Sequence, residues 1–389
     1  MKIVEKVVIV IPTYNERGNI EPLLSTLRKV FENVPEKWDM NILIVDDSSP
    51  DGTGEAVKAE MKKMNNLYLF TNEQKIGLGG AYIKGIGYAI EKLKADLIFE
   101  MDADFQHDEN LIPRFLEKID AGADLVLGSR YMEGGSVPKY WGIMRKILSM
   151  GGNIFTRVMM LDPSIHDWTT GFRALRPWVF MKVKDQITEL KTYSFQISFL
   201  YFARKAGAKV AEVPLNFKER RWGESKLPGV EGTIKTFWFV IKTRFFDLLG
   251  SRFFKFGVVG FAGFVVNFIF LRLFRSLGFA EVFAWLFSTE LAIINNYTLN
   301  NIWTFKEVKI GGLKNTVIKF IQFNVTSAGA LIIQSIFGPL GVKLVGVEYD
   351  YLVLMFVIAV MVLPYNYLMY NLVIWKTWKL PWKRNSTKD

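Results

Sequence analysis

The chain has 389 residues, half of them hydrophobic, with a formal charge of +11, no cysteine and two histidines. Its length allows two domains or more, and the absence of cysteine excludes disulfides, thiolate catalysis and cysteine-bound zinc or iron–sulfur centres. A histidine-based triad or a histidine-rich metal site is not expected, because only His107 and His166 are present.

The first 217 residues alternate short apolar segments with amphipathic ones. The pattern predicts strands at 7–11, 41–46, 67–71, 97–101, 124–128 and 209–217, and helices at 18–34, 53–64, 78–94, 109–121 and 193–206. This alternation indicates an α/β fold, in which helices cover both faces of an open, mostly parallel sheet. Ligands of such sheets bind outside the carboxyl ends of the strands.

Polar clusters follow three of the predicted strands at that edge. Pro12, Tyr14 and Glu16 follow the first strand, and Asp46 and Asp47 end the second. The strand at 97–101 leads into a third cluster, Asp102, Asp104 and Gln106. Because alternate side chains of an extended chain point to the same side, these three are expected to converge. Their oxygens suit a divalent metal ion.

The second half has a different composition. Four apolar segments, each near or above the ~20 residues that cross a bilayer, occupy 253–275, 282–303, 317–346 and 351–375. They predict an all-α domain of four membrane spans over residues 251–389. This region holds 14 Lys/Arg against 6 Asp/Glu, a net of +8. Because the basic surplus flanks apolar runs, the expected partner is a lipid bilayer rather than nucleic acid.

Loop charges predict the orientation of this multi-pass protein. Lys306, Lys309 and Lys314 lie between the second and third segments, whereas Glu348 and Asp350 lie between the third and fourth. The positive-inside rule then places the first 250 residues and the C-terminus in the cytoplasm. Arg272 and Arg275, at the outer end of the first segment, point the other way.

Residues 229–250 connect the two halves. Their aromatic residues, together with Lys235, Lys242 and Arg244, predict an amphipathic helix in the lipid headgroup region. A continuation of the first span is the alternative.

Six motifs together resemble those of inverting nucleotide-sugar glycosyltransferases, and most closely those of the dolichol-phosphate mannose synthases. They are IPTYNE (11–16), VDDSSPDGT (45–53), DADFQH (102–107), GSRY (128–131), TGFRA (170–174) and ERRWGESK (219–226). The resemblance implies a Rossmann-like glycosyltransferase A fold over a catalytic domain of residues 1–228. It also implies Mg²⁺ or Mn²⁺, GDP-mannose as donor and dolichyl or another polyprenyl phosphate as acceptor. The second half resembles GtrA-like four-span domains at Asn296-Tyr297-Thr298-Leu299-Asn300 and Trp303-Thr304-Phe305.

Within this resemblance, each polar cluster receives a role. Asp102, Asp104 and Gln106 are expected to bind the metal, which neutralises the leaving nucleoside diphosphate, and Asp104 is expected to be catalytic. The residues expected to hold the base and ribose are Pro12, Tyr14, Glu16, Asp46 and Asp47, with Asp102 completing the donor nucleotide site. Which of Asp46 and Asp47 contacts the base is left open.

The acceptor is expected to need positive charge rather than a base. A phosphate monoester has a second pKa of about 6 and is already an anion at neutral pH. Arg130 and Arg145 are assigned to its phosphate as catalytic residues, with Ser149 on the same helical face as Arg145. Further phosphate contacts are expected from Arg173, Arg221 and Lys226.

The predicted activity is synthesis of dolichyl β-D-mannosyl phosphate on the cytoplasmic face of the membrane, with inversion of the donor's α linkage. Nothing in the sequence calls for a protein partner. One alternative is a polyprenyl-phosphate glucosyltransferase that uses UDP-glucose. Another is a flippase of lipid-linked sugar with a regulatory soluble domain, which would use the intramembrane polar residues Glu290, Asn295, Asn296, Asn324 and Gln334.

Overall fold

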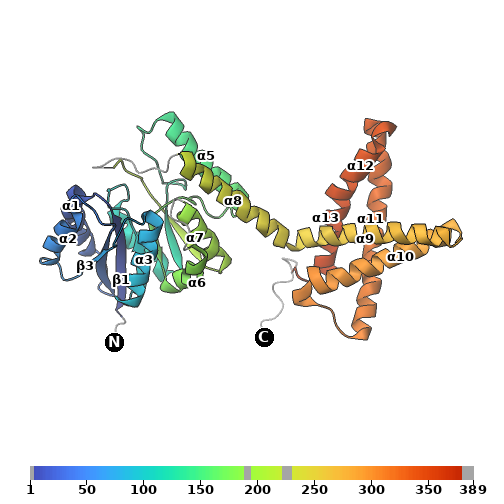
Figure 1. Ribbon diagram of the computed structural model, residues 1–389, viewed down its shortest axis with the longest axis horizontal. Coiled ribbons are helices and arrows are strands. Elements are labelled where there is room, and N and C mark those ends of the chain that lie inside the picture. The colour runs from blue at the N-terminus through green and yellow to red at the C-terminus, as the bar shows by residue number, and fades with distance from the viewer. Residues whose placement is uncertain (1–3, 188–193, 221–229, 379–389) are drawn as a thin grey trace. The chain divides into compact units, whose positions relative to one another are not determined.

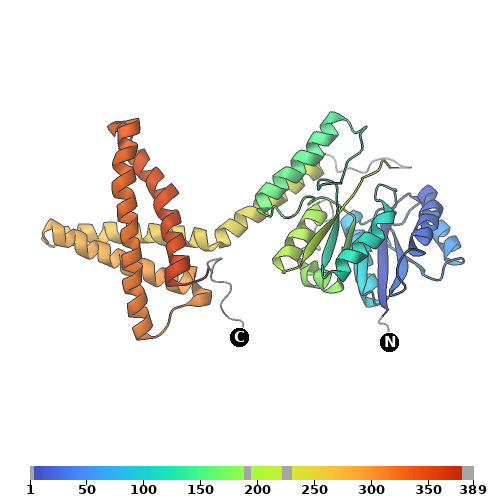
Figure 2. The same ribbon diagram turned by 180° about the vertical axis from the view of Figure 1, so that it is seen from behind.

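The computed structural model describes residues 4–187, 194–220 and 230–378. The chain divides into two compact units, residues 1–244 and 245–389, and each is described by itself. The first unit is an α/β domain, and the described part of the second contains helices and no strand (Figures 1 and 2).

A seven-stranded sheet forms the centre of the first unit, with the order β3-β2-β1-β4-β6-β5-β7. Its strands are β1 (Glu5–Thr13), β2 (Trp38–Asp46), β3 (Leu67–Thr71), β4 (Leu97–Glu100), β5 (Leu125–Ser129), β6 (Arg173–Leu175) and β7 (Val210–Pro214). All described pairings are parallel except those of β6, which runs antiparallel to both β4 and β5. The predicted strands are therefore confirmed, while β6 is an additional strand.

Helices cover both faces of the sheet, as the alternating pattern predicted. They are α1 (Arg17–Phe31), α2 (Thr53–Met61), α3 (Leu78–Glu91), α4 (Ile112–Asp120), α6 (Pro177–Ile187) and α7 (Ser194–Lys205), with a 3₁₀ turn at Glu109–Leu111. Val7, Ile9 and Ile11 of β1 face the core under α1, α2 and α4. The alternate residues Val8 and Val10 face the core under α3, α6 and α7. This period of two is the pattern of a strand buried on both faces.

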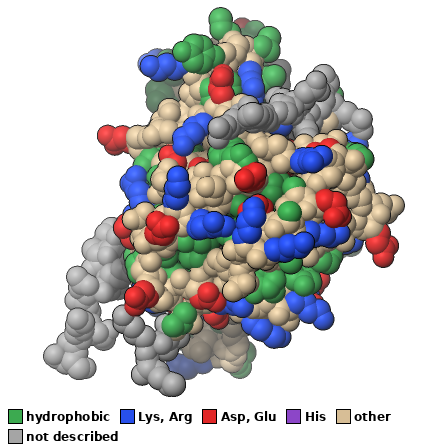
Figure 3. Space-filling view, turned by 90° about the vertical axis from the view of Figure 1, so that its left-hand side faces the viewer, with side chains coloured by type: hydrophobic (Ala, Val, Ile, Leu, Met, Phe, Trp, Pro, Cys, Tyr) green, Lys and Arg blue, Asp and Glu red, His purple; other side chains and the backbone are tan. Residues whose placement is uncertain are grey.

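Two further helices lie beside each other at the carboxyl edge of the sheet. They are α5 (Ile143–Met160) and α8 (Val230–Gly250). The rings of Phe155 and Phe237 pack at 4.7 Å between centroids, and Val240 joins the core that contains α3 and α7. Figure 1 shows the two helices running along each other. Figure 3 shows acidic and basic side chains interspersed on one face of the first unit.

The second unit consists of helices with three π-helical segments. Its elements are α9 (Arg252–Ser276), α10 (Glu281–Leu299), a π turn at Asn300–Thr304, a 3₁₀ turn at Lys306–Val308, α11 (Leu313–Val345), a 3₁₀ turn at Val347–Tyr349, α12 (Asp350–Val357), a π turn at Ile358–Val362, α13 (Leu363–Met369) and a π turn at Tyr370–Ile374. Among the described residues, three helices are long and apolar enough to cross a membrane: Arg252–Ser276, Leu313–Val345 and Met355–Ile374. Helix α10 is not among these three, so the fourth span stays a prediction.

Polar side chains fix one end of this helical unit. Asn301 accepts from the Ile310 amide at 2.8 Å and donates to the Ile310 carbonyl at 3.0 Å, and it also accepts from Trp375 Nε1 at 3.2 Å. Trp375 stacks on Phe305 at 4.3 Å between ring centroids. Nearby, a Cβ at Gly263 would overlap the Asn296 side chain, so α9 and α10 approach closely only because residue 263 is glycine.

Candidate active site

A cavity of about 490 Å³ opens at the carboxyl edge of the sheet in the first unit. Its polar lining includes Asp102, Gln106, His107, Arg130, Arg145, Ser149, Thr169, Thr170 and Gln196. Its apolar lining comes mainly from α5 and α8, through Met144, Leu148, Phe155, Phe237 and Val240. The cavity is therefore charged at the sheet edge and apolar along the two helices.

Asp102 is held from two sides at the floor of this cavity. The Tyr82 hydroxyl, on α3, donates to Asp102 Oδ1 at 3.0 Å, and the Asp102 amide donates to His107 Nδ1 at 3.1 Å. Burial lowers the pKa of His107 to about 4, so its ring is neutral and Nδ1 stays an acceptor. The Asp102 side chain is 32% exposed, which leaves part of its carboxylate facing the cavity.

Asp104 and Gln106 do not converge with Asp102 in the way an extended chain would arrange them. Strand β4 ends at Glu100, and Phe105 has a left-handed backbone with φ of 64°. The Gln106 amide donates to Asp104 Oδ1 at 3.1 Å, which closes a tight turn. Gln106 still lines the cavity with Asp102, whereas Asp104 is buried. The chain is therefore not extended over these residues, while metal binding by the three side chains together stays a prediction.

Asp104 has a cationic partner. Arg220 Nη2 lies 2.8 Å from Asp104 Oδ2. Burial and the neighbouring charge of Asp102 raise the pKa of Asp104, and Arg220 opposes this rise. Among the described residues no group of three or more His, Asp or Glu side chains is placed to hold a metal ion.

Space for a ligand exists beside Asp102. A Cβ at Gly171 would lie 3.6 Å from Gln196 Nε2, 3.7 Å from His107 Cε1 and 3.8 Å from Asp102 Oδ2, which are ordinary contact distances to side-chain atoms. Gln196 is buried, and its side-chain hydrogen bond to the Glu100 carboxylate opposes the rise in the pKa of that carboxyl. A carboxylate with amides from Gln106 and Gln196 around a small open space is a donor set that fits a hard, oxygen-preferring cation and its ligands.

The two acids that end β2 organise the expected donor-nucleotide region. Asp46 accepts from the Ser49 amide at 3.1 Å and the Ser49 hydroxyl at 2.5 Å, and from Thr13 Oγ1 at 3.2 Å. Asp47 accepts from the Ile76 and Gly77 amides at 3.0 and 2.9 Å. Both side chains are buried. They hold the loops around them, a role that sequence reasoning did not assign.

Tyr14 and Glu16 lie at the end of β1 in the same region. The Lys75 ammonium lies 3.7 Å from the centroid of the Tyr14 ring. Glu16 accepts from Asn19 Nδ2 at 2.6 Å, and its amide donates to Thr53 Oγ1 at 3.0 Å. Pro12 is the penultimate residue of β1 and is half-buried. The structure thus gathers the ends of β1 and β2 with the loop before α3.

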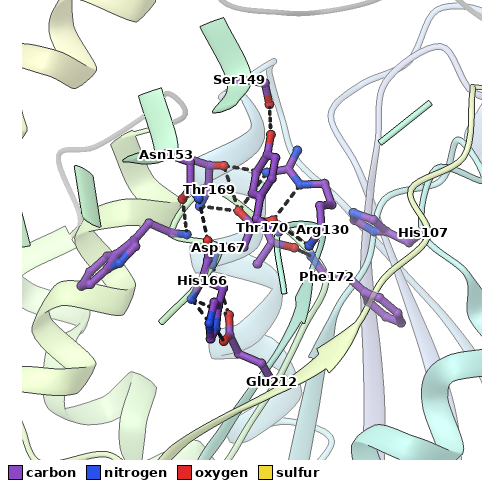
Figure 4. Close-up of polar contacts among 12 residues, drawn as sticks. His107, Arg130, Ser149, Asn153, His166, Asp167, Thr169, Thr170, Phe172 and Glu212 are labelled. Carbon is purple, nitrogen blue, oxygen red and sulfur yellow. Dashed lines mark hydrogen bonds and ion pairs between the residues drawn. The ribbon is translucent and has the colours of Figure 1, made fainter. Parts of the chain in front are cut away.

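Arg130 lines the cavity and is held by a buried carboxylate (Figure 4). Its Nε donates to Asp167 Oδ2 at 2.7 Å and its Nη2 to Asp167 Oδ1 at 2.9 Å. Nη2 also donates to Thr169 Oγ1 at 2.6 Å. Burial favours a higher pKa for Asp167, but Arg130 and several hydrogen bonds hold the pKa of this carboxyl below its usual range. Asp167 escaped the sequence analysis because nothing local links it to a residue 37 positions away.

Arg145 and Ser149 lie on α5, one turn apart, and both line the cavity. The Arg145 guanidinium lies 4.0 Å from the centroid of the Trp141 ring. Ser149 Oγ is 2.5 Å from the Tyr131 hydroxyl. Arg130, Arg145 and Ser149 therefore line the same cavity. For Arg145 and Ser149, the spacing of four residues on one helix predicted this.

Arg173 does not reach the cavity, so its prediction as a phosphate contact is wrong. It belongs to β6 and pairs in register with Glu100 of β4, and both side chains are fully buried. Burial raises the pKa of Glu100 to about 7, although Arg173 opposes the rise. The other two predicted phosphate contacts, Arg221 and Lys226, lie outside the described residues.

Known proteins match both halves of the chain. Residues 8–183 match the glycosyl transferase family 2 model, and residues 255–375 match the GtrA/DPMS transmembrane domain model. Dolichol-phosphate mannosyltransferase of Pyrococcus furiosus is 36% identical over 320 residues, which cover 81% of this chain and 85% of the relative.

Two further relatives match just over half of this chain. Undecaprenyl-phosphate mannosyltransferase of Micrococcus luteus is 38% identical over 58% of this chain and 88% of its own length. Polyprenol monophosphomannose synthase of Mycolicibacterium smegmatis is 39% identical over 58% of this chain and 82% of its own length. The chain therefore belongs to glycosyl transferase family 2, alongside the dolichol-phosphate mannosyltransferases, and carries a GtrA/DPMS transmembrane domain after its catalytic domain.

Proposed function

We propose that the protein transfers mannose from GDP-mannose to dolichyl or another polyprenyl phosphate and forms the β-linked mannosyl phosphate lipid. The relatives support a polyprenyl-phosphate mannosyltransferase, since each carries such a name. We propose three features in addition: GDP as the nucleotide, inversion at the anomeric carbon, and a preference for dolichyl chains.

The observation that carries the proposal is the two-sided lining of the cavity. Asp102, Arg130 and Arg145 line its charged side, and the apolar side chains of α5 and α8 line the other. A prenyl phosphate has the same division, with an anionic head and a long apolar chain. A site built for a sugar hydroxyl acceptor would have no use for the apolar wall.

The outward face of α5 supports a lipid acceptor as well. Ile143, Ile147, Ile154 and Val158 are between 54% and 78% exposed. Such apolar exposure along one helix is unusual on a soluble surface. Lys146, whose ammonium donates to the Lys139 carbonyl at 2.7 Å, adds a positive charge to the same helix. We propose that this face enters the interfacial region of the bilayer, where the prenyl chain is dissolved.

The chemistry follows from the charges of the two substrates. An oxygen of the lipid phosphate attacks the anomeric carbon while the bond to the GDP oxygen breaks, so GDP leaves with the electron pair and the linkage inverts. The phosphate is already anionic and needs no general base. Arg130 and Arg145, with Ser149, would hold it against repulsion by the donor diphosphate.

Asp102 and Gln106 are the residues proposed to hold a Mg²⁺ or Mn²⁺ ion, with Asp104 joining them once its carboxylate leaves Arg220. When bound, such an ion supplies Lewis-acid neutralisation of the diphosphate leaving group. Transfer by the full-length protein is expected to stop in excess EDTA and to return when either metal is restored.

The donor base and ribose are proposed to bind between the ends of β1 and β2, against Pro12, Tyr14 and Glu16. The carboxylates of Asp46 and Asp47 each accept three hydrogen bonds from the protein itself. Both acids therefore shape the site by holding the loops that follow β2 and precede α3.

The membrane half is proposed to span the bilayer four times, with the catalytic domain and the C-terminus in the cytoplasm. Three apolar helices and the GtrA/DPMS match support a membrane protein. The basic connection between α10 and α11, with Lys306, Lys309 and Lys314, supports this orientation.

Radiolabelled transfer tests the proposal directly. Full-length protein in detergent is incubated with polyprenyl phosphate and either GDP-[¹⁴C]mannose or UDP-[¹⁴C]glucose, and label in the organic phase is counted. Label from GDP-mannose alone is the expected result. Label from UDP-glucose alone would instead assign a glucosyltransferase, and no label from either would contradict transfer. The anomeric configuration of the product, measured by its NMR coupling, tests inversion.

A further inference from the structure

Few residues of the helix that carries Arg145 and Ser149 are fully buried. Of the 18 residues of α5, all of them described, only Asn153 and Thr156 are buried. The Thr156 hydroxyl donates to Gly152 within its own helix at 2.8 Å, so it fixes nothing across the domain. Asn153 is thus the buried polar side chain of α5 that bonds outside its own helix, in addition to the contact of Ser149 with Tyr131 and the packing of Phe155, Met159 and Met160 against the core.

Asn153 makes two hydrogen bonds to the backbone of one short segment (Figure 4). Its Nδ2 donates to the His166 carbonyl at 2.5 Å, and its Oδ1 accepts from the Trp168 amide at 2.9 Å. The amide of a single side chain therefore spans both neighbours of Asp167. Because donor and acceptor are both used, the position of the helix along this segment is defined.

The same segment holds Arg130. Asp167 is fully buried and binds the Arg130 guanidinium at two points, and it also accepts from the Arg130 amide at 3.1 Å. From the other side, Glu212 of β7 accepts from the amides of His166 and Asp167 at 3.0 and 3.2 Å. The segment is thus fastened to the sheet, and Arg130 takes its position from it.

We propose that Asn153 is a positioning residue that sets the location of Arg145 and Ser149 relative to Arg130. Residues 166–168 act as a common frame, with Arg130 on one side and α5 on the other. Two cations that grip one phosphate must keep their spacing to a fraction of an ångström, because charge-assisted contacts need good geometry. This inference rests on the proposed function, since it takes the acceptor phosphate to bind between Arg130 and Arg145.

The test compares variants of the full-length protein with a short-chain prenyl phosphate as acceptor. Asn153→Ala is expected to raise the KM for this acceptor roughly 10-fold, the scale seen when a group that orients a ligand-binding residue is lost. The Kd for GDP with Mn²⁺ is expected to stay within about twofold of the parent. Asn153→Asp keeps the acceptor for the Trp168 amide but removes the donor to His166, and is expected to raise the same KM.

Loss of stability alone is controlled by Val183→Ala. Val183 is buried on α6 and belongs to the core, away from the cavity. This substitution is expected to lower Tm, as Asn153→Ala does, without changing the acceptor KM. A double variant supplies a second readout. In an Arg145→Ala background, Asn153→Ala is expected to raise the acceptor KM little further. If Asn153 acts by positioning Arg145, its effect is lost once Arg145 is gone, so the two effects are not additive.

Two results overturn the inference, and they are distinguishable. If the parent transfers mannose but Asn153→Ala changes the acceptor KM no more than Val183→Ala does, only the positioning role fails. If the parent transfers no sugar to any prenyl phosphate, the proposed function fails and the inference fails with it.

Discussion

The hydroxyl of Tyr82 donates to one oxygen of Asp102 at 3.0 Å. A side chain of α3 therefore orients a carboxylate that lines the cavity. Tyr82 is fully buried, and its ring lies parallel to that of Phe195. The other Asp102 oxygen, Oδ2, lies 3.8 Å from His107 Nε2 and on the side of Gly171.

Tyr82→Phe tests the importance of this contact, because it keeps the stacked ring and removes only the hydroxyl. We expect Mn²⁺ affinity, measured by electron paramagnetic resonance in the presence of GDP, to fall roughly 10-fold. Excess metal should restore part of the transfer rate. Tyr88→Phe, on the same helix but packed against Phe70, is the control and should match the parent. Equal metal affinity in Tyr82→Phe and the parent would exclude an orienting role for the hydroxyl.

Arg145→Ala tests the acceptor phosphate site with little risk to the fold, because Arg145 stacks on Trp141 at the cavity lining. We expect the acceptor KM to rise, or kcat to fall, at least ~10-fold, since one charge-assisted contact contributes about 1.5–3 kcal/mol. Affinity for GDP-mannose should change much less. Arg28→Ala removes the same charge from an exposed position on α1, which does not line the cavity, and is the control. Weakened donor binding with an unchanged acceptor KM would assign Arg145 to the donor diphosphate.

Arg130→Ala should differ from Arg145→Ala in its effect on folding. Removing Arg130 leaves the fully buried Asp167 without its cation, and breaking a buried pair costs about 3–5 kcal/mol. We therefore expect a lower Tm in addition to the acceptor defect. Arg130→Lys retains the charge but cannot reproduce the two-point contact, so it should recover stability only in part. An unchanged Tm in Arg130→Ala would show that Asp167 finds another partner or takes up a proton.

The parts of the fold that were predictable are those with strong periodicity. The spacing of apolar residues identifies β1 as a strand and α4 as a helix. Parallel strands have their carboxyl ends at one edge of the sheet, whatever their order in it. This is why Asp46, Asp102 and Arg130, which follow different strands, were expected at one edge. Their side-chain partners were not predictable, since they come from residues far away in the chain.

Three particular errors and omissions have a physical origin. Strand β6 has three residues, which is too short for a period to be recognised. Without the strand, Arg173 was predicted to be a cation that contacts phosphate, whereas it is buried beside Glu100 of β4. The left-handed conformation of Phe105 ends the extended chain after β4, and such a conformation is rare enough in a bulky residue that no sequence rule would propose it.

Arg220 and a bound metal ion are expected to compete for Asp104. The Arg220 guanidinium lies 2.8 Å from Asp104 Oδ2, where it neutralises a carboxylate proposed as a metal ligand. Arg220→Gln should therefore bind Mn²⁺ more tightly than the parent when no nucleotide is present, as read by the paramagnetic signal of free Mn²⁺. Lys218→Gln, two residues away and paired with Asp108, is the control. Weaker Mn²⁺ binding in Arg220→Gln would mean that the arginine helps to build the metal site.

The exposed face of α5 should matter only when the acceptor is in a bilayer. Ile147 is 58% exposed there, and a glutamate at this position would carry a charge into the headgroup region, against anionic lipid. We expect Ile147→Glu to slow transfer to long-chain polyprenyl phosphate in proteoliposomes roughly 10-fold, an energy of about 1.4 kcal/mol. Transfer to a short-chain acceptor in detergent should remain close to that of the parent. Met61→Glu makes the same change at an exposed apolar residue of α2 and should affect neither assay. If Ile147→Glu slowed both assays equally, the apolar face of α5 would serve the fold or the cavity rather than contact with lipid.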